Sequence, residues 1–258
     1  MTTPPIPSRP KAGLFVTCLV DLIRPSIGFA AARLIELAAC DVFVPQGQTC
    51  CGQPAYNSGD KANAAALARQ TVRAFADCDY VVAPSGSCAG QLKLHVPRLL
   101  AGTGDAAAAE TFANRVFELT DFLYRERKLA TVPGTFSGTA TYHDSCSGLR
   151  ELGIKSQPRA LLAMVQGLTL KEMTDCETCC GFGGLFAVKF PGISNAIVEK
   201  KAVNADASGA QLLLAGDLGC LMNIAGKLNR TGSNLACRHI AEVLAGEMSA
   251  PPIAKAEI

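Results

Sequence analysis

The stretch Gln48-Thr49-Cys50-Cys51-Gly52 decides how this sequence is interpreted, because Cys179-Cys180-Gly181 repeats its second part 129 residues later. Two more cysteines of each half match at almost the same spacing: Cys18 with Cys146, and Cys88 with Cys220. Four pairs at nearly one offset rarely arise by chance, so the pattern indicates an internal duplication. We expect two similar halves that join in the Pro-, Gly- and Ser-containing stretch 131–138.

Each half alternates short apolar, β-prone runs with segments of helical periodicity. The expected strands are residues 14–16, 42–44 and 80–83 in the first half and 141–142, 168–170 and 212–214 in the second. The expected helices lie within residues 27–38, 64–75, 158–165, 193–207 and 221–228. Strands that alternate with helices of this length form parallel βαβ units with right-handed crossovers. The sequence therefore predicts an α/β fold of two similar βαβ-type halves, each with a small parallel sheet and flanking helices.

These elements divide the chain into four segments. We expect a loose N-terminal tail at 1–12, a first cysteine-rich domain at 13–130, a second at 139–248 and a C-terminal tail at 249–258. The first ten residues are polar and Pro-rich and lack the apolar core of a secretory signal. No stretch approaches the roughly 18 apolar residues of a membrane span. We expect a cytoplasmic protein that reaches a membrane only indirectly, through a partner.

The composition is that of a globular protein with no electrostatic preference for nucleic acid. Of 258 residues, 49% are hydrophobic and 18% charged, and 24 basic against 22 acidic residues leave a formal net charge of +2. No basic stripe is present, which argues against nucleic acid as a partner. Twelve cysteines is a high number for a chain without an export signal. Disulfide scaffolds belong to small secreted domains, so metal ligands or redox-active thiols are the better interpretation.

The predicted topology gathers each cysteine set at one edge of a sheet. In a parallel sheet the carboxyl ends of the strands point the same way, and sites form at that edge. The two predicted ligand sets are Cys18, Cys50, Cys51 and Cys88 in the first half, and Cys146, Cys179, Cys180 and Cys220 in the second. Adjacent cysteines reach one centre only if the backbone turns sharply, and the glycine that follows permits the positive φ of such a turn.

Four thiolates per site suit two kinds of metal centre. They fit a [4Fe–4S] cluster, which gives one or two iron–sulfur clusters per chain. They also fit a closed zinc site with four cysteine ligands, an alternative that applies to either set. For a single Cys-Cys pair, a buried structural pair or a reversible disulfide is the competing interpretation. The recurrence of the pair with matching outer cysteines favours metal.

Other residues near the two sets have several interpretations. Cys176 precedes Cys179 by three residues and has no match in the first half, so we interpret it as a spare thiol, with a ligand or resolving cysteine as alternatives. His143, at a predicted strand end beside the second site, is a candidate for proton transfer or for a hydrogen bond to a thiolate. A hydrogen bond to the loop backbone is its structural alternative. We expect the unmatched Cys40, Cys78 and Cys237 to pack as small hydrophobic side chains.

Six phrases carry a resemblance to a known family. In the first half they are Phe15-Val16-Thr17-Cys18-Leu19-Val20-Asp21, Gln48-Thr49-Cys50-Cys51-Gly52-Gln53-Pro54-Ala55 and Pro84-Ser85-Gly86-Ser87-Cys88. In the second half they are Tyr142-His143-Asp144-Ser145-Cys146, Cys179-Cys180-Gly181-Phe182-Gly183-Gly184 and Asp217-Leu218-Gly219-Cys220-Leu221-Met222. From about Gly13 to Gly246 the chain resembles proteins with two CCG (cysteine-rich) domains. These include the cysteine-rich subunit of heterodisulfide reductase, the iron–sulfur subunit of glycolate oxidase and, most similar, the lactate utilization protein A group.

The resemblance implies partners and a substrate. It implies a subunit that works with a ferredoxin-type iron–sulfur subunit and a third subunit of a lactate utilization complex. Together they would oxidise a small 2-hydroxy acid, L-lactate, to pyruvate without NAD. In the wider family each motif ends in C-x-x-C, and its five cysteines can hold a non-cubane cluster. Here Ser85 and Asp217 stand at the first cysteine of each C-x-x-C, which favours an ordinary cubane. Asp217 is a candidate carboxylate ligand, and we expect Ser85 to cap the next helix.

Three functional hypotheses follow. The first is an iron–sulfur subunit of an NAD-independent L-lactate-oxidising complex, which transfers electrons from the oxidation to partner iron–sulfur subunits and is part of an oxidoreductase rather than a complete enzyme. The second is a thiol–disulfide redox subunit like that of heterodisulfide reductase, against which the absent fifth cysteine counts. The third is a zinc-stabilised scaffold subunit of the same complex. The identity of the metal separates the first hypothesis from the third.

Overall fold

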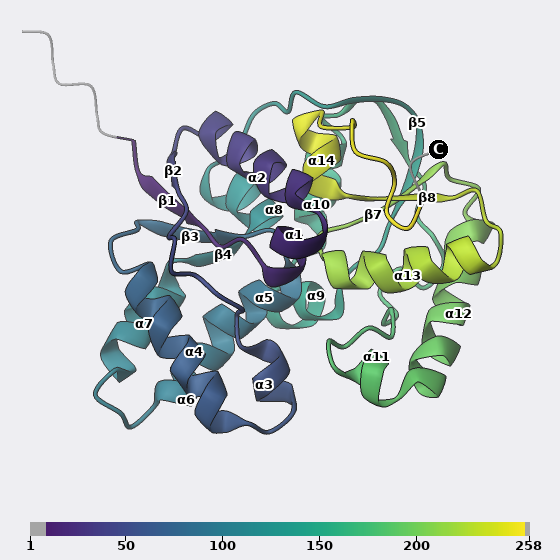
Figure 1. The fold of residues 1–258 in the computed structure, drawn as a ribbon. Helices are drawn as coiled ribbons and strands as arrows, with labels where there is room; N and C mark the ends of the chain where they lie inside the picture. Colours follow the sequence, from purple (N-terminus) through teal and green to yellow (C-terminus); the bar gives the residue numbers. More distant parts are fainter. Residues whose placement is uncertain (1–8, 256–258) are drawn as a thin grey trace, which may run out of the picture.

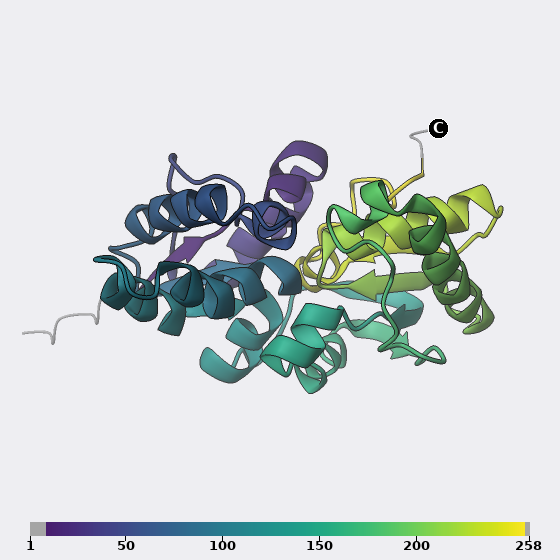
Figure 2. The ribbon, with the colours of Figure 1, turned by 90° about the horizontal axis from the view of Figure 1, so that it is seen from below.

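A computed structural model describes residues 9–255, which form two α/β halves that lie side by side (Figures 1 and 2). Each half contains a four-stranded, all-parallel sheet, with strand order β2-β1-β3-β4 in the first and β6-β5-β7-β8 in the second. The predicted α/β fold of two similar halves is thereby confirmed. The outer parts of the two expected tails, residues 1–8 and 256–258, lie outside the described residues.

The first half carries its sheet between two groups of helices. Its strands are β1 (Lys11–Leu14), β2 (Asp41–Phe43), β3 (Tyr80–Ala83) and β4 (Val116–Glu118). Its helices are α1 (Cys18–Ile23), α2 (Pro25–Leu37), α3 (Gln53–Asn57), α4 (Lys61–Ala74), α5 (Gly86–Gly90), α6 (Val96–Leu100), α7 (Ala106–Asn114) and α8 (Leu119–Asp121), with π-helical turns η1 (Gln91–His95) and η2 (Phe122–Glu126). Helix α2 begins with a proline and buries an apolar stripe that includes Ile27, Ala31 and Leu34, as its sequence period requires.

The second half repeats this order with fewer helices. Its strands are β5 (Thr135–Tyr142), β6 (Gln166–Leu170), β7 (Leu212–Ala215) and β8 (Ala236–His239). Its helices are α9 (Cys146–Leu152), α10 (Ser156–Leu162), α11 (Phe186–Lys189), α12 (Pro191–Ala207), α13 (Leu218–Arg230) and α14 (Ile240–Ala245). The five helices expected from the sequence correspond to α2, α4, α10, α12 and α13.

The structure differs from the expected elements at the sheet edges and at the first strand. Each half has a fourth strand, β4 or β8, where the sequence pattern gave three. Both are short, and β8 ends in the buried polar residues Arg238 and His239, so neither shows an apolar run. The first strand covers Lys11–Leu14 instead of 14–16, because Lys11 to Gly13 pair with β2. Strand β5 begins at Thr135, inside the stretch 131–138 that we expected to join the halves.

The two halves exchange their last helices. Helix α14 of the second half packs on α2 of the first, and α8 and η2 of the first half pack on α10 of the second. Figure 1 shows α14 beside α2, although they come from opposite ends of the chain. One apolar core runs through this contact and contains Ile27 and Leu34 of α2 together with Ile240 and Leu244 of α14. On the side of the sheets that α2 and α14 cover, the two halves therefore share one core, and each keeps a core cluster of its own on the other side.

Polar side chains also connect each exchanged helix to the opposite half. Arg24 Nε lies 2.8 Å from Glu242 Oε1, and Ser26 Oγ donates to the same oxygen at 2.7 Å. At the equivalent place in the other half, Gln157 Nε2 donates to Asp121 Oδ1 at 2.9 Å. The Glu242 side chain is fully buried and that of Arg24 is 10% exposed, so this ion pair is tightly fixed. The approximate twofold relation between the halves thus extends to individual side chains.

Candidate metal centres

Helix N-termini hold two of the four thiols in each set. Cys18 and Cys146 are the first residues of α1 and α9, and Cys88 and Cys220 lie in the first turn of α5 and α13. Ser85 Oγ accepts a hydrogen bond from the Cys88 backbone N–H at 3.3 Å, which confirms the capping role expected for Ser85. These helices begin where strands end, so the thiols collect at the carboxyl edge of each sheet.

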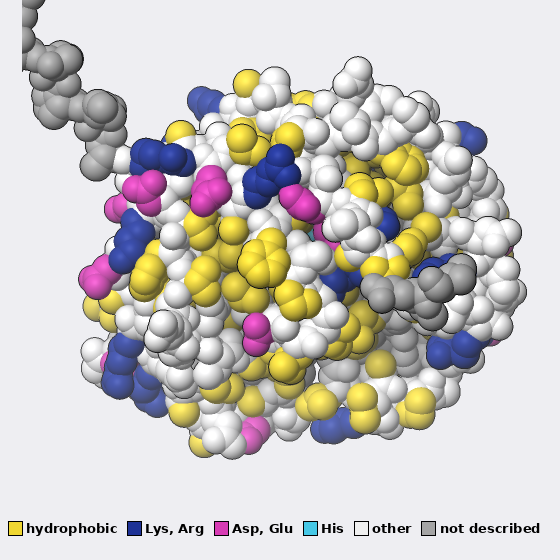
Figure 3. Space-filling view, turned by 45° about the horizontal axis from the view of Figure 1, so that its top comes forward, with side chains coloured by type: hydrophobic (Ala, Val, Ile, Leu, Met, Phe, Trp, Pro, Cys, Tyr) yellow, Lys and Arg dark blue, Asp and Glu magenta, His cyan; other side chains and the backbone are white. Residues whose placement is uncertain are grey.

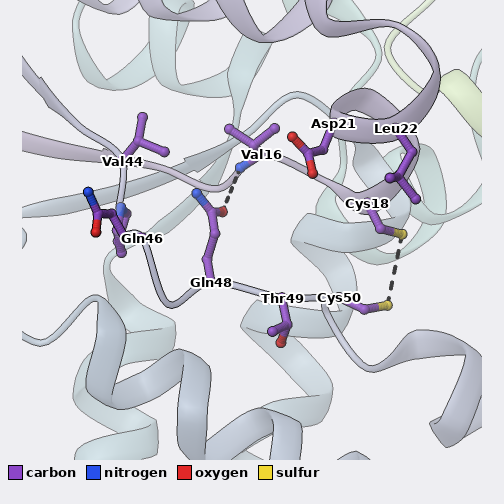
Figure 4. A pocket seen from close by; sticks show the side chains of 10 residues that line it. Val16, Cys18, Asp21, Leu22, Val44, Gln46, Gln48, Thr49 and Cys50 are labelled. Carbon is purple, nitrogen blue, oxygen red and sulfur yellow. Dashed lines mark hydrogen bonds between the residues drawn. The ribbon is translucent and has the colours of Figure 1, made fainter.

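The structure brings the four cysteines of the first half together. Cys18 Sγ and Cys50 Sγ are 4.0 Å apart (Figure 4). Thiol hydrogen bonds continue from Cys50 to Cys51 and from Cys51 to Cys88. Hydrogen bonds from the Cys18 and Cys51 thiols lower the pKa of Cys50 to about 2, and the bond to Cys50 raises the pKa of Cys18. Within this group Cys50 is therefore the thiol that loses its proton most readily, and the thiolate is the form that binds a metal.

The second half repeats this chain of thiols. Hydrogen bonds link Cys146 to Cys179, Cys179 to Cys180 and Cys180 to Cys220. The bonds from Cys146 and Cys180 lower the pKa of Cys179 to about 2. All twelve cysteines of the chain are free thiols in the structure, so neither Cys-Cys pair is a disulfide.

A left-handed glycine after each Cys-Cys pair turns the backbone as the sequence predicts. Gly52 has φ 85° and Gly181 has φ 81°, a region that residues with a Cβ seldom adopt. The turn aims backbone N–H groups at the sulfurs: Gly181 N lies 3.3 Å from Cys179 Sγ, and Phe182 N lies 3.5 Å from Cys180 Sγ. Such N–H donors stabilise thiolate sulfur.

The four thiols of each half fit the iron–sulfur cluster and the zinc ion that the sequence predicts. Four thiol groups per half, gathered at one edge of the sheet, are the ligand type of iron–sulfur clusters. They also suit zinc, because sulfurs at about 2.3 Å from a tetrahedral ion lie about 3.8 Å from one another. The Cys18–Cys50 separation of 4.0 Å is close to that value. The eight cysteines would hold either group, and the choice of metal stays a prediction.

His143 lies against the second set. One of its ring nitrogens and the sulfurs of Cys180 and Cys220 all lie within 4.8 Å of one another. The side chain is fully buried, and neither ring nitrogen has a hydrogen-bond partner in the described residues. Burial and the nearby Lys201 lower the pKa of His143 to about 4, so the imidazole is neutral at neutral pH.

Lys201 and Arg159 add positive charge around the second set. Lys201 is fully buried in α12, and its Nζ donates to the backbone carbonyl of Asp175. Arg159 holds Asp144 through two hydrogen bonds of 2.8 and 2.9 Å. The thiol of Cys176 accepts from Arg159 Nη2 at 3.9 Å, and burial raises its pKa, so it is not an activated thiolate. A ligand role for Cys176 remains a prediction.

Asp217 joins the two halves. Its Oδ1 accepts from the N–H groups of Gly219 and Cys220, which caps α13. Its Oδ2 accepts from Ser85 Oγ and Ser87 N, both at 3.0 Å, across the boundary between the halves. Asp217 and Ser85 occupy equivalent positions, so the approximate twofold axis passes between them. Both carboxylate oxygens accept hydrogen bonds, and a ligand role for Asp217 stays a prediction.

Two adjoining cavities lie along this boundary. One of about 170 Å³ reaches from Cys18 and Cys88 to Phe182 and Leu185 of the other half. The other, of about 200 Å³, reaches from Cys146 and Cys179 to Gln53 and His95 of the first half. Each thiol set thus faces residues of the opposite half. Sequence patterns did not predict Gln53 or His95 as site residues; the position of Gln53 directly after Cys-Cys-Gly was the one available signal.

The first set also opens to a surface cavity. This cavity, of about 330 Å³, is lined by Cys18 and Cys50 together with Asp21, Leu22 and Val44 (Figure 4). Around it, Leu22 is 80%, Phe29 75% and Ile23 53% exposed. Figure 3, which brings the α2 side of the molecule forward, shows hydrophobic side chains spread over this part of the surface. We call Leu22, Ile23, Phe29 and Val44 the α1–α2 apolar patch.

Comparison with known proteins agrees with the duplicated site. Residues 12–93 and 140–225 each match the family model of the cysteine-rich domain CCG. The protein "Lactate utilization protein A 2" of Bacillus cereus (strain Q1) is 42% identical over 93% of this chain and 99% of its own length. "Lactate utilization protein A" of Geobacillus kaustophilus is 46% identical over 91% of this chain and 98% of its own. The chain belongs to the lactate utilization protein A family.

A solved structure shows the same fold at low sequence identity. A hypothetical protein from Helicobacter pylori superposes with a TM-score of 0.66 at 11% identity, over 96% of this chain. The chain spans 50% of the length of that protein, and the likeness concerns the fold alone. As for membranes, none of the helices between residues 9 and 255 of this lactate utilization protein A family member has the length and apolar character needed to cross a bilayer.

Proposed function

We propose that this chain is the iron–sulfur subunit of a cytoplasmic complex that oxidises L-lactate to pyruvate without NAD. The observation that carries the proposal is the pair of four-thiol sets, each drawn together at the carboxyl edge of a parallel sheet. Relatives that are 42% and 46% identical are named for lactate utilization, which supports lactate as the substrate of the complex.

The number of thiol sets equals the number of electrons that lactate oxidation releases. Oxidation of L-lactate to pyruvate breaks the Cα–H and O–H bonds and releases two protons and two electrons. A bound [4Fe–4S] cluster exchanges one electron at a time. Two thiol sets in one chain, one in each half, therefore provide places for both electrons.

The α1–α2 apolar patch supports a partner on the side of the first set. Cys18 and Cys50 are partly exposed in the cavity that Leu22 and Val44 of this patch also line (Figure 4). We propose that the ferredoxin-type iron–sulfur subunit docks here, because its centre must come close to a thiol-bound centre to exchange electrons. Leu22→Glu together with Phe29→Glu should then weaken the complex at least tenfold in a pull-down or titration with that subunit. Val203→Glu, at an apolar residue of α12 that is 63% exposed and lies outside the patch, is the control.

Metal and acid-labile sulfide analysis of protein purified without oxygen tests the function. Two filled sites predict about eight iron atoms and about eight sulfides per chain. About half of each would leave one site with a cluster. Zinc without sulfide would overturn the electron-transfer role.

The zinc scaffold is the second candidate, favoured by the 4.0 Å separation of Cys18 and Cys50 sulfurs. A thiol–disulfide reductase like heterodisulfide reductase has less support. At the two positions where such proteins have a fifth cysteine, Ser85 and Asp217 hydrogen-bond to each other across the boundary between the halves.

A further inference from the structure

The two halves differ at one position directly behind the thiols. Phe15 N donates to the carbonyl of Val82 at 2.8 Å, and His143 N donates to the carbonyl of Leu214 at 2.8 Å. Each residue follows the first strand of its half and precedes the first cysteine of its set by three residues. Phe15 and His143 are therefore structural equivalents.

Their surroundings are the same thiols. Phe15 is fully buried in a core cluster with Cys51 and Cys88. His143 is fully buried with a ring nitrogen inside the 4.8 Å group that contains Cys180 and Cys220. A phenyl ring completes the apolar wall of the first site. An imidazole at the same place offers a lone pair to the second.

The one backbone group that acts on the imidazole is that of Cys176, and it does not reach hydrogen-bond geometry. Both ring nitrogens are buried, and neither has a hydrogen-bond partner among the described residues. A buried polar group without a partner is destabilising, and a ligand at the site would recover that loss. The lone pair of an imidazole nitrogen is a common metal ligand.

We propose that His143 is a protein ligand of the metal centre in the second site, where it takes one of the terminal ligand positions beside Cys180 and Cys220. The first site, with Phe15 at this position, has four thiolate ligands and no imidazole. This inference rests on the proposed function, because the ligand is assigned to an iron–sulfur centre. It makes the two centres chemically distinct, since imidazole ligation raises the reduction potential of iron–sulfur centres.

Pulsed electron paramagnetic resonance of the reduced protein, labelled with ¹⁵N only in histidine, tests the ligand directly. We expect a strong ¹⁵N coupling in the wild-type chain and its loss in His143→Phe, which copies the first site. Phe15→His should add a second ¹⁵N coupling. The chain has three histidines, so His95→Gln, which leaves His143 in place, should keep the coupling.

The outcomes separate the two proposals. Iron and sulfide in the wild-type protein without a strong ¹⁵N coupling would overturn the ligand role of His143 and leave the proposed function intact. This comparison needs only wild-type protein, so it holds even if His143→Phe loses its centre. Zinc without sulfide would overturn the proposed function and the iron ligand with it.

Discussion

The two thiol sites have the same four cysteines in different surroundings. Behind the first set stand Phe15 and Thr71, and at the equivalent places behind the second stand His143 and Lys201. The position of the helices supports this equivalence. Leu67 of α4 lies against Gly52, and Ile197 of α12 lies against Gly181 in the same way. Thr71 and Lys201 each follow four residues later in these helices. Both halves have kept the four cysteines, whereas the residues that determine the charge around these cysteines differ between the halves.

This difference bears on the direction of electron flow. A buried cation and an imidazole stabilise added negative charge, so the second centre should hold an electron more readily than the first. Two cysteines of each set are partly exposed; the first set lies beside the α1–α2 apolar patch, whereas Lys201 and Arg159 lie near the second. The halves are thus similar in fold and specialised in chemistry.

The largest effect should come from removing one thiol at a time. Cys51→Ala and Cys180→Ala each delete a buried ligand, so each should lower the iron content by about half, as expected for two four-iron centres. Metal and sulfide analysis measures this. Cys78→Ala, a buried cysteine outside both sets, should keep the full content. Complete loss of iron from either ligand variant would show that the two centres assemble as one.

The exchanged helices offer a second comparison of the halves. Glu242→Gln leaves the buried Arg24 guanidinium without its partner and should lower the free energy of unfolding by about 3–5 kcal/mol. Asp121→Asn, at the equivalent contact with the uncharged Gln157, should cost only about 1 kcal/mol. Urea unfolding of both variants at equal metal content measures the difference, and equal losses would contradict it.

Glu118 and His239, the N-cap residues of α8 and α14, should change the stability of the protein with pH in opposite directions. Burial raises the pKa of Glu118, which caps α8, from its ordinary 4.5 to about 7. The folded state then binds this proton more tightly than the unfolded state, so stability should fall by about 3 kcal/mol as pH rises from about 4.5 to about 7. Glu118→Gln should remove this slope in urea unfolding followed against pH.

His239, which caps α14, is the counterpart of Glu118. Burial lowers the pKa of His239 below its ordinary 6.5, so its contribution to stability is lost as pH falls below that value. His239→Asn should therefore flatten the acid side of the profile and leave the slope due to Glu118. If the stability of the wild-type protein and of Glu118→Gln depends on pH in the same way, Glu118 is not the source of the slope between pH about 4.5 and about 7.

The smallest effect should distinguish the two turn glycines. Gly52→Ala places its Cβ no closer than 3.6 Å to any atom, so it should cost about 1 kcal/mol for the left-handed backbone alone. Gly181→Ala would bring a Cβ to 2.7 Å from the Ser194 carbonyl oxygen and should cost about 2–3 kcal/mol. Thermal unfolding of the pair measures this, and a larger loss for Gly52→Ala would reverse the comparison.

The sequence predicted the fold class because its strongest signals are local. Apolar runs and the matched cysteines were enough to give the parallel halves and to gather each thiol set at a sheet edge. Strands β4 and β8 were missed because three or four residues carry too little periodicity, and Arg238 and His239 conceal the second of them.

What the sequence could not give depends on contacts between the halves. The pairing of Ser85 with Asp217 joins residues 132 positions apart, and that of Arg24 with Glu242 joins residues 218 apart. No local pattern encodes either pair. The position of His143 beside the second site followed from the motif around Cys146, but its unpartnered ring nitrogens are a property of the packed core.

The exchange of last helices has a consequence for biosynthesis. The apolar stripe of α2 is made within the first 40 residues, yet its cover, α14, is among the last segments to leave the ribosome. The first half must wait, with Ile27 and Leu34 uncovered, until nearly the whole chain has been translated. Truncated or stalled chains therefore expose hydrophobic surface that chaperones and proteases recognise. A chain then folds around both thiol sets only when the entire polypeptide has been made.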